Sequence, residues 1–247
     1  MKYTATRRNE RGHTLIELLV ALGVLGLVTA GVFGQLNTAA QRIYTEQVKV
    51  DNFDQARDFV DQFFRDINQI GYPNGRIVTG LTNVTNPDPR TNARVAVGLV
   101  RITPTSIWFE GDINGTGVVQ EVQYQINGSG NCTLCFQRSA VPKVDGTAQL
   151  AQFAIADWGT EVNDLITPVI FTYFDANGNQ ITAVPADIAT SPTVLAQVKT
   201  IHISLTIQDP NVTDPKTHQQ IQTSFEGEVS LNNCSLAADG FNPMSCK

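Results

Sequence analysis

Residues 14–33 read TLIELLVALGVLGLVTAGVF, twenty residues with a single charged side chain, Glu17. A helix of about 20 apolar residues is long enough to cross a bilayer. A carboxylate in such a segment costs roughly 2.5–3.5 kcal/mol near the bilayer centre, so it normally has a partner and a function. The stretch therefore predicts a membrane helix in which Glu17 is the unusual feature.

The charges on either side of this stretch are unevenly distributed. Residues 1–12 carry a formal net charge of +3, which leaves −9 for residues 13–247 out of a total of −6. Lys and Arg flanking a membrane helix favour the cytoplasmic side. We therefore expect the basic end in the cytoplasm and the acidic body on the exported side. An acidic body also disfavours non-specific nucleic-acid binding, which depends on Lys and Arg.

Three interpretations of the apolar segment compete. It resembles a secretory signal peptide, with small residues at Val28-Thr29-Ala30 for a signal peptidase. It also fits a plain single-pass anchor. A third interpretation is a short leader cut between Gly12 and His13, which leaves the apolar run on the mature chain. This cut explains Glu17, because the new α-amino group lies four residues before the carboxylate. An ammonium one helical turn away, on the same chain or a neighbour, can neutralise it.

The sequence of residues 11–19, RGHTLIELL, resembles the processing site of type IV prepilins and pseudopilins. The resemblance implies that prepilin peptidase cuts after Gly12. It also implies that Glu17, the fifth residue of the mature chain, registers subunits in the filament. The first mature residue is usually an N-methylated phenylalanine, and here it is His13.

Four glycines interrupt the apolar run: Gly23, Gly26, Gly31 and Gly34. Small residues let helices approach closely in lipid. In the resembling family this stretch can also unwind locally when subunits enter the filament. Both interpretations stay open.

The helix is predicted to continue beyond the membrane to about residue 70. Apolar side chains at positions 53, 56, 60, 63, 67 and 70 form a one-sided stripe, which Phe59 and Phe64 widen. The sequence Gly71-Tyr72-Pro73 predicts the end of the helix. Charged residues predict a solvated face opposite the stripe: Asp51, Asp54, Arg57, Asp58, Asp61, Arg65 and Asp66.

The remainder of the chain predicts strands separated by turns. The last two alternate apolar and polar residues regularly and are predicted to pair. The expected strands are residues 96–103, 106–110, 117–126, 134–138, 168–175, 200–207 and 221–231. An antiparallel sheet laid across the helix stripe buries both apolar surfaces. The predicted fold is therefore α+β and type IV pilin-like, with a long N-terminal helix on an antiparallel β-sheet.

Four segments make up the predicted organisation. They are a removed leader (1–12), a transmembrane helix segment (13–36), its amphipathic continuation (37–71) and a β-rich periplasmic or extracellular head (72–247). We expect a single-pass protein of the inner membrane, exposed at the cell surface in an assembled pilus.

Residues 64–67, FRDI, followed by Ile70-Gly71-Tyr72, are similar to the helix end of PilW-type minor pilins. Residues 109–115, FEGDING, are similar to their sheet segments. The resemblance implies a minor pilin of the tip-priming complex, with other pilins, prepilin peptidase and the inner-membrane assembly platform as partners. Two alternatives remain: a minor pseudopilin of type II secretion, and a secreted or anchored binding domain with an ordinary signal peptide.

The four cysteines, Cys132, Cys135, Cys234 and Cys246, are expected on the exported side, where an even count favours disulfides. Proximity along the chain favours Cys132–Cys135 and Cys234–Cys246, although three pairings are open. Zinc at Cys132 and Cys135 would need a second pair of ligands at finger-like spacing, and the sequence offers none.

Asp112, Asn114 and Thr116 alternate as in the first half of a calcium loop, but Gln123 stands where such a loop has glutamate. A hairpin turn is the competing interpretation. The three histidines belong to no nucleophile motif. We therefore expect no enzymatic activity and no cofactor other than calcium at this loop.

Overall fold

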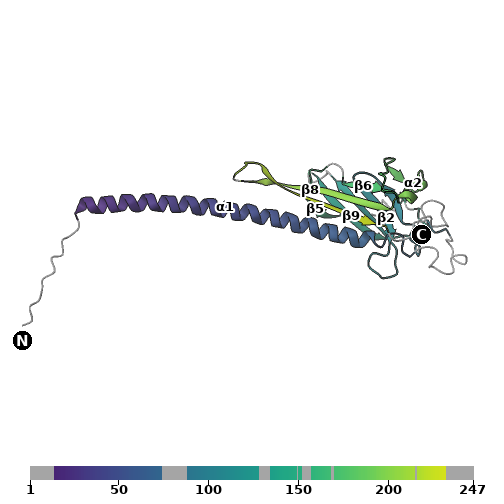
Figure 1. Cartoon of the computed structure of the whole chain (residues 1–247). Coiled ribbons are helices and arrows are strands. Elements are labelled where there is room, and N and C mark those ends of the chain that lie inside the picture. The colour runs from purple at the N-terminus through teal and green to yellow at the C-terminus, as the bar shows by residue number, and fades with distance from the viewer. Residues whose placement is uncertain are drawn as a thin grey trace, which may run out of the picture. The chain divides into compact units, whose positions relative to one another are not determined.

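The computed structural model describes residues 14–73, 88–127, 134–148, 150–151, 157–167, 170–214 and 216–231. Two compact units, Met1–Gln47 and Val48–Lys247, make up the chain. Helix α1 (Leu15–Ile67) begins in the first unit and ends in the second. The fold is α+β, with a long N-terminal helix packed on antiparallel β-sheets, as the sequence predicts (Figure 1).

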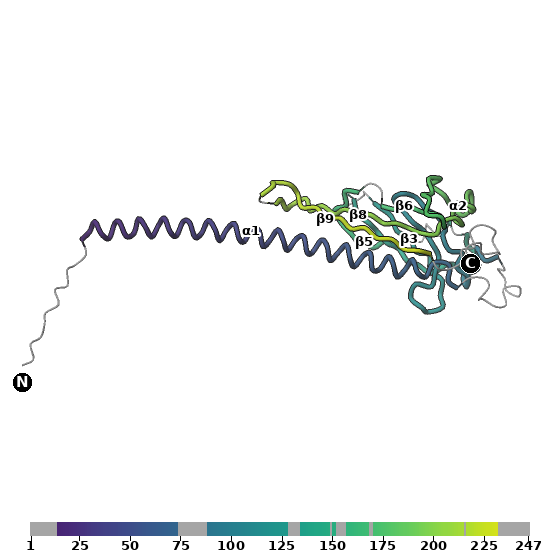
Figure 2. Tube along the Cα trace, viewed as in Figure 1, coloured from purple at the N-terminus to yellow at the C-terminus, as the bar shows by residue number. Residues whose placement is uncertain are grey.

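Two antiparallel sheets and a short helix form the second unit. The larger sheet has the strand order β5-β4-β3-β2-β1-β7, and the smaller has the order β6-β8-β9 (Figure 2). The strands are β1 (Leu99–Ile102), β2 (Ser106–Gly111), β3 (Gln120–Asn127), β4 (Cys135–Pro142), β5 (Gly159–Val162), β6 (Phe171–Phe174), β7 (Ala186–Asp187), β8 (Thr200–Thr213) and β9 (Gln220–Ser230). Helix α2 (Pro192–Gln197) lies between β7 and β8.

The end of α1 differs from the prediction, because the helix stops at Ile67 rather than near Ile70. Ile70 instead pairs with Gly111 of β2, and the Gly71 N–H donates to the Glu110 carbonyl over 2.9 Å. Gly71 has a φ of +73°, which glycine adopts without steric cost. The last residues of the predicted helix therefore pair with the end of β2 instead.

The strand predictions hold in position and differ in length. The pairing of the last two strands is confirmed, with Ile201 opposite Val229. β8 continues to Thr213, past Pro210, where the register with β9 shifts. A shift of this kind accommodates proline, which cannot donate to the ladder. β5, β7 and α2 were not predicted.

The stripe of α1 packs against both sheets. The Phe59 ring lies 4.7 Å from that of Phe136 on β4, between centroids. The Phe63 ring lies 5.3 Å from Tyr124 on β3 and 5.5 Å from Phe171 on β6. All five side chains are buried. Burying each contributes about 1.5–3 kcal/mol, so this aromatic group is the centre of the core.

The two faces of the helix differ from the prediction at two residues. Phe53, expected in the stripe, is 44% exposed, and its ring contacts Phe225 of β9 at 6.1 Å. Asp66, expected on the solvated face, is only 1% exposed. Its carboxylate accepts from the Tyr124 hydroxyl at 2.6 Å and pairs with the Arg138 guanidinium at 2.8 Å. The prediction for Asp66 was wrong because its partners come from the sheet, and helical periodicity does not register them.

Candidate functional site

The first unit exposes its apolar side chains. Every residue from 14 to 44 is exposed, and the most apolar part of α1 has a mean hydropathy of 2.3 with none of it buried. In the part of the chain that the structure describes, α1 is the one helix long and apolar enough to cross a membrane. A stable helix with no buried apolar face needs lipid or other helices around it.

Glu17 and Thr14 form a reciprocal cap at the start of α1. The backbone N–H and the hydroxyl of Thr14 donate to Oε2 of Glu17, at 2.9 and 3.1 Å. The Glu17 N–H approaches the Thr14 hydroxyl oxygen at 3.4 Å. This is the geometry of a capping box, and the carboxylate also faces the positive end of the helix dipole. The local sequence Thr-x-x-Glu therefore holds the Glu17 carboxylate with donors of its own helix.

The glycines of the apolar run have nothing packed beside them in the single chain. A Cβ on Gly23, Gly26, Gly31 or Gly34 would meet no atom within 4 Å. The helix is also continuous across all four positions. Nothing within the chain therefore requires glycine there, and small residues at these positions would let another helix approach closely.

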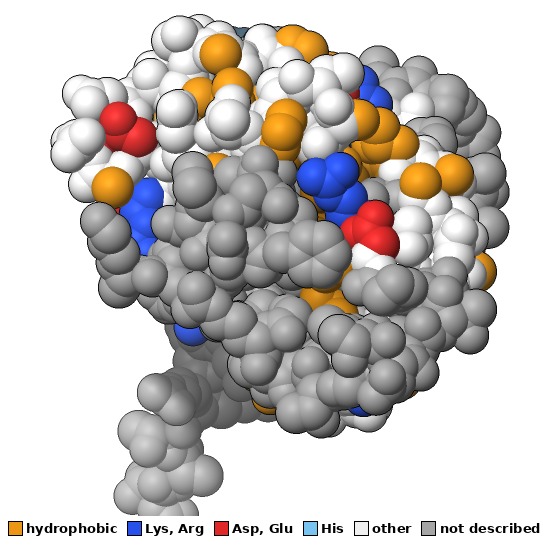
Figure 3. All heavy atoms as spheres, turned by 90° about the vertical axis from the view of Figure 1, so that its right-hand side faces the viewer, with side chains coloured by type: hydrophobic (Ala, Val, Ile, Leu, Met, Phe, Trp, Pro, Cys, Tyr) orange, Lys and Arg blue, Asp and Glu red, His pale blue; other side chains and the backbone are white. Residues whose placement is uncertain are grey.

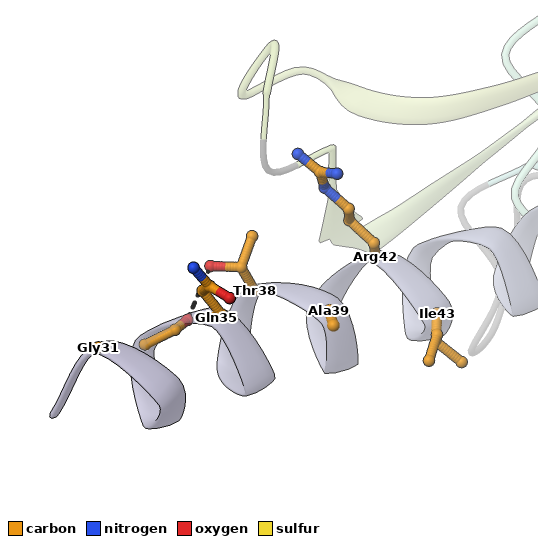
Figure 4. A pocket seen from close by; sticks show the side chains of 7 residues that line it. Gly31, Gln35, Thr38, Ala39, Arg42 and Ile43 are labelled. Atoms are coloured by element: carbon orange, nitrogen blue, oxygen red, sulfur yellow. Dashed lines mark hydrogen bonds between the residues drawn. The ribbon is translucent and has the colours of Figure 1, made fainter. Parts of the chain in front are cut away.

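A shallow hollow of about 640 Å³ lies along α1 from the end of the apolar run onward, lined by Gly31, Gly34, Gln35, Thr38, Ala39, Arg42 and Ile43 (Figure 4). Small residues form its middle. The Thr38 hydroxyl donates to the Gly34 carbonyl at 3.0 Å, so it is satisfied within the helix. The hollow is a surface of low relief on which a second helix can lie closely.

The comparison with known families concerns this same segment. Residues 7–33 match the family model of the prokaryotic N-terminal methylation motif. The match supports a type IV pilin-like or pseudopilin-like protein, anchored by a single span, processed by prepilin peptidase and assembled with other pilins. It ends before the second unit begins. No curated protein matches the chain.

The predicted processing residues, Gly12 and His13, lie outside the described residues, so the cut between them stays a prediction. Three of the four cysteines, Cys132, Cys234 and Cys246, also lie outside them. Cys135 is buried at the start of β4 and is not a free thiol. The disulfide pairings stay predictions.

The loop that carries the predicted calcium ligands lies between β2 and β3. The Asp112 carboxylate accepts from the N–H groups of Thr116 and Gly117, at 3.0 and 2.7 Å. The Asn114 side-chain oxygen accepts from the Thr116 hydroxyl at 2.6 Å. These hydrogen bonds lie within the turn itself and satisfy its polar groups. Among the described residues, no group of three or more His, Cys, Asp or Glu could hold a metal ion. Calcium at this turn stays a prediction.

A buried charge cluster joins β2, β3 and the segment after β4. The sequence did not predict it. The Lys143 ammonium lies 2.7 Å from Oε2 of Glu110, both side chains are fully buried, and two backbone carbonyls accept from the same ammonium. Glu121 on β3 lies directly opposite Glu110 on β2. The Trp108 indole N–H donates to Oε2 of Glu121 at 2.5 Å. The Lys143 ammonium thus offsets the charge of Glu110, one of the two glutamates that face each other across β2 and β3.

The second carboxylate of this cluster, that of Glu121, has a raised pKa. Burial raises the pKa of Glu121 well above its usual value, and the negative charge and hydrogen bond of Glu110 raise it further. The Trp108 hydrogen bond and the Lys143 charge oppose this shift. The Oε1 atoms of both glutamates have no other donor. The cluster links β2, β3 and Lys143 within the second unit through the Glu110–Lys143 ion pair and the Trp108–Glu121 hydrogen bond.

One end of the second unit is shown in Figure 3. Hydrophobic side chains are scattered among polar atoms there, and the few basic groups that the view shows lie near acidic ones. The described part of this face thus presents no broad surface of one charge.

Proposed function

We propose that the chain is a minor pilin of the PilW type, which assembles with other pilins in the inner membrane and takes part in initiating the pilus. The observation that carries the proposal is the exposed apolar helix of residues 14–44 with one carboxylate at its start. The methylation motif over the same residues supports it. The second unit would lie on the exported side, where an acidic body is expected.

The proposed assembly step is an exchange of partners at Glu17. In the single chain the carboxylate accepts from the Thr14 N–H and hydroxyl. In the filament the α-amino group of a neighbouring mature chain, cut after Gly12, would lie against it. A charged partner in lipid attracts a carboxylate more strongly than neutral donors do. The carboxylate would thereby fix the axial position of one subunit against the next.

The first test compares three variants of the full chain: Glu17→Ala, Glu17→Gln and Thr14→Ala. We expect all three to be cut after Gly12, so that mass spectrometry finds a mature chain beginning at His13. Sheared filaments should contain the Thr14 variant and lack both Glu17 variants, because only those two lose the charge. A mature chain beginning at Gly31 would contradict the pilin assignment and indicate an ordinary signal peptide. If the Glu17→Gln variant entered filaments as well as the wild type, the proposed ion pair at Glu17 would be contradicted, but the pilin assignment would not.

The second test separates a pilus from a type II secretion filament. A deletion strain should lose surface pili and keep its secreted enzymes in the medium. Loss of enzyme export with normal pili would instead assign the chain to the secretion system. Complementation with the wild-type chain is the control.

A further inference from the structure

A groove of about 460 Å³ crosses strands β1, β2 and β3 of the second unit. The chain has two tryptophans, Trp108 and Trp158, and both line this groove. Arg101, Gln123 and Gln125 supply polar groups along it. We call these five residues with their hollow the tryptophan groove.

The walls of the tryptophan groove are held in place from behind. The indole N–H of Trp108 is engaged by Glu121, so the ring cannot turn freely. The turn between β1 and β2 is fixed by Tyr173, whose hydroxyl contacts the Thr103 and Ser106 carbonyls at 2.9 and 3.2 Å. A site that is already formed loses little entropy when it binds a ligand.

The polar groups of the groove include one whose hydrogen-bonding capacity is unused. The Gln123 side chain is 3% exposed, and its Nε2 has no acceptor. Buried amides are nearly always paired, so an unpaired one beside a groove indicates a missing partner. Gln125 on β3 is half-buried, and Arg101 on β1, opposite Asp187 of β7, is exposed. Among the described residues that line the groove there is no carboxylate.

We propose that the tryptophan groove binds a carbohydrate. The C–H face of a sugar ring packs on the negative face of an indole, and sugar hydroxyls both donate to and accept from amides. Arg101 binds carboxylates in a two-pronged geometry, so acidic sugars should bind more tightly than neutral ones. This inference does not depend on whether the filament is a pilus or a secretion filament.

Two other ligand classes fit the groove less well. Single-stranded nucleic acid also stacks on aromatic rings, but it needs a track of basic residues, and Arg101 is the one cation among the described lining residues. A purely apolar ligand would leave the Gln123 amide unpaired. A carbohydrate uses the partly exposed Trp158 ring, the amides and the guanidinium together, and the buried Trp108 forms the floor.

The test uses the full chain in lipid nanodiscs, because the sugar headgroups of maltoside detergents could themselves bind in the groove. Tryptophan fluorescence is titrated with maltohexaose, an N-acetylglucosamine oligomer, sialyllactose and an oligogalacturonate, and an oligothymidylate serves as the competing ligand. Both tryptophans report on the groove, and Trp108 still reports when Trp158 is replaced. We expect a saturable change with at least one acidic sugar and weaker binding of the neutral ones.

Matched variants identify the site. Trp158→Ala should weaken binding roughly tenfold, as removal of a central aromatic contact does. Arg101→Gln should weaken acidic sugars only, and Arg94→Gln, exposed and outside the groove, should change nothing. Urea midpoints of the variants verify folding, and Arg101→Gln tests the site even if Trp158→Ala fails to fold. The proposal is overturned by no saturable response to any sugar, by unchanged binding in both groove variants, or by tighter binding of the oligothymidylate.

Discussion

At the scale of single residues, Asp66 shows how α1 is joined to the larger sheet. Its carboxylate accepts hydrogen bonds from the Tyr124 hydroxyl and, at 2.7 Å, from the side-chain amide of Gln62. It also pairs with the Arg138 guanidinium. A buried charge is costly unless it is paired and hydrogen-bonded, and these three donors meet that condition. The contact therefore fixes both the rotation of the helix and its position along β3 and β4.

Asp66→Ala should lower the free energy of unfolding by about 3 kcal/mol, because it leaves the largely buried guanidinium of Arg138 without its partner. Asp61→Ala is the matched control, since Asp61 is 59% exposed and lies 3.9 Å from Arg57. Asp61→Ala should lower the free energy of unfolding by less than about 0.5 kcal/mol. Urea unfolding followed by tryptophan fluorescence measures both, because both tryptophans lie in the second unit. Equal midpoints for the two variants would contradict the role of Asp66.

Glu121 should make the stability of the second unit depend on pH. Its folded-state pKa is raised, so the folded chain holds this proton more tightly than the unfolded chain does. The contribution is fully present below the unfolded pKa of about 4.3 and is lost as the pH rises through the raised value. Glu121→Gln keeps an acceptor for Trp108 and needs no proton. We expect it to remove this decline, measured as urea midpoints across the same pH range; an unchanged slope would refute the assignment.

At the scale of secondary-structure elements, the chain passes from α1 into the sheet at one crowded point. Gly111 ends β2 beside this point, and a Cβ there would overlap the backbone carbonyl of Gln69. A backbone atom cannot move aside as a flexible side chain can. The close approach of these two backbones therefore requires glycine.

Gly111→Ala should destabilise the second unit by about 2 kcal/mol, as overpacking commonly does. Gly159→Ala is the control in the same sheet, because its Cβ would meet the Arg138 carbonyl at an ordinary 3.8 Å. We expect it to stay within about 0.5 kcal/mol of the wild type. Urea midpoints distinguish the two variants, and a neutral Gly111→Ala would show that the junction relaxes.

The elements differ in how far their sequences could predict them. β8 and β9 were predictable because each has one buried face, which gives a clean alternation. β7 has only two residues, and β5 buries only Val162, so neither shows an apolar period. Helix α2 is six residues long and buries only Leu195, so it has no apolar stripe. Contacts between distant elements, such as Asp66 with Arg138, leave no local pattern.

At the scale of the whole molecule, the two units were predictable to different degrees. The importance of Glu17 could be predicted because a lone charge in an apolar run is conspicuous. Its cap could also have been predicted, since Thr14 and Glu17 have the spacing of a capping box. The tryptophan groove could not, because the strands that bring Trp108 and Trp158 together are assembled only by the tertiary fold.

The hydroxyl of Thr29 donates to the Leu25 carbonyl at 2.7 Å, and it is the one polar side-chain group between residues 18 and 34. Along this length the helix thus offers a neighbour shape and no directional bond. Helices joined by shape alone depend on close packing, because a small gap between them already forfeits much of the dispersion attraction. In the proposed assembly, the axial position of each helix would therefore depend on the Glu17 carboxylate rather than on any bond made along this stretch.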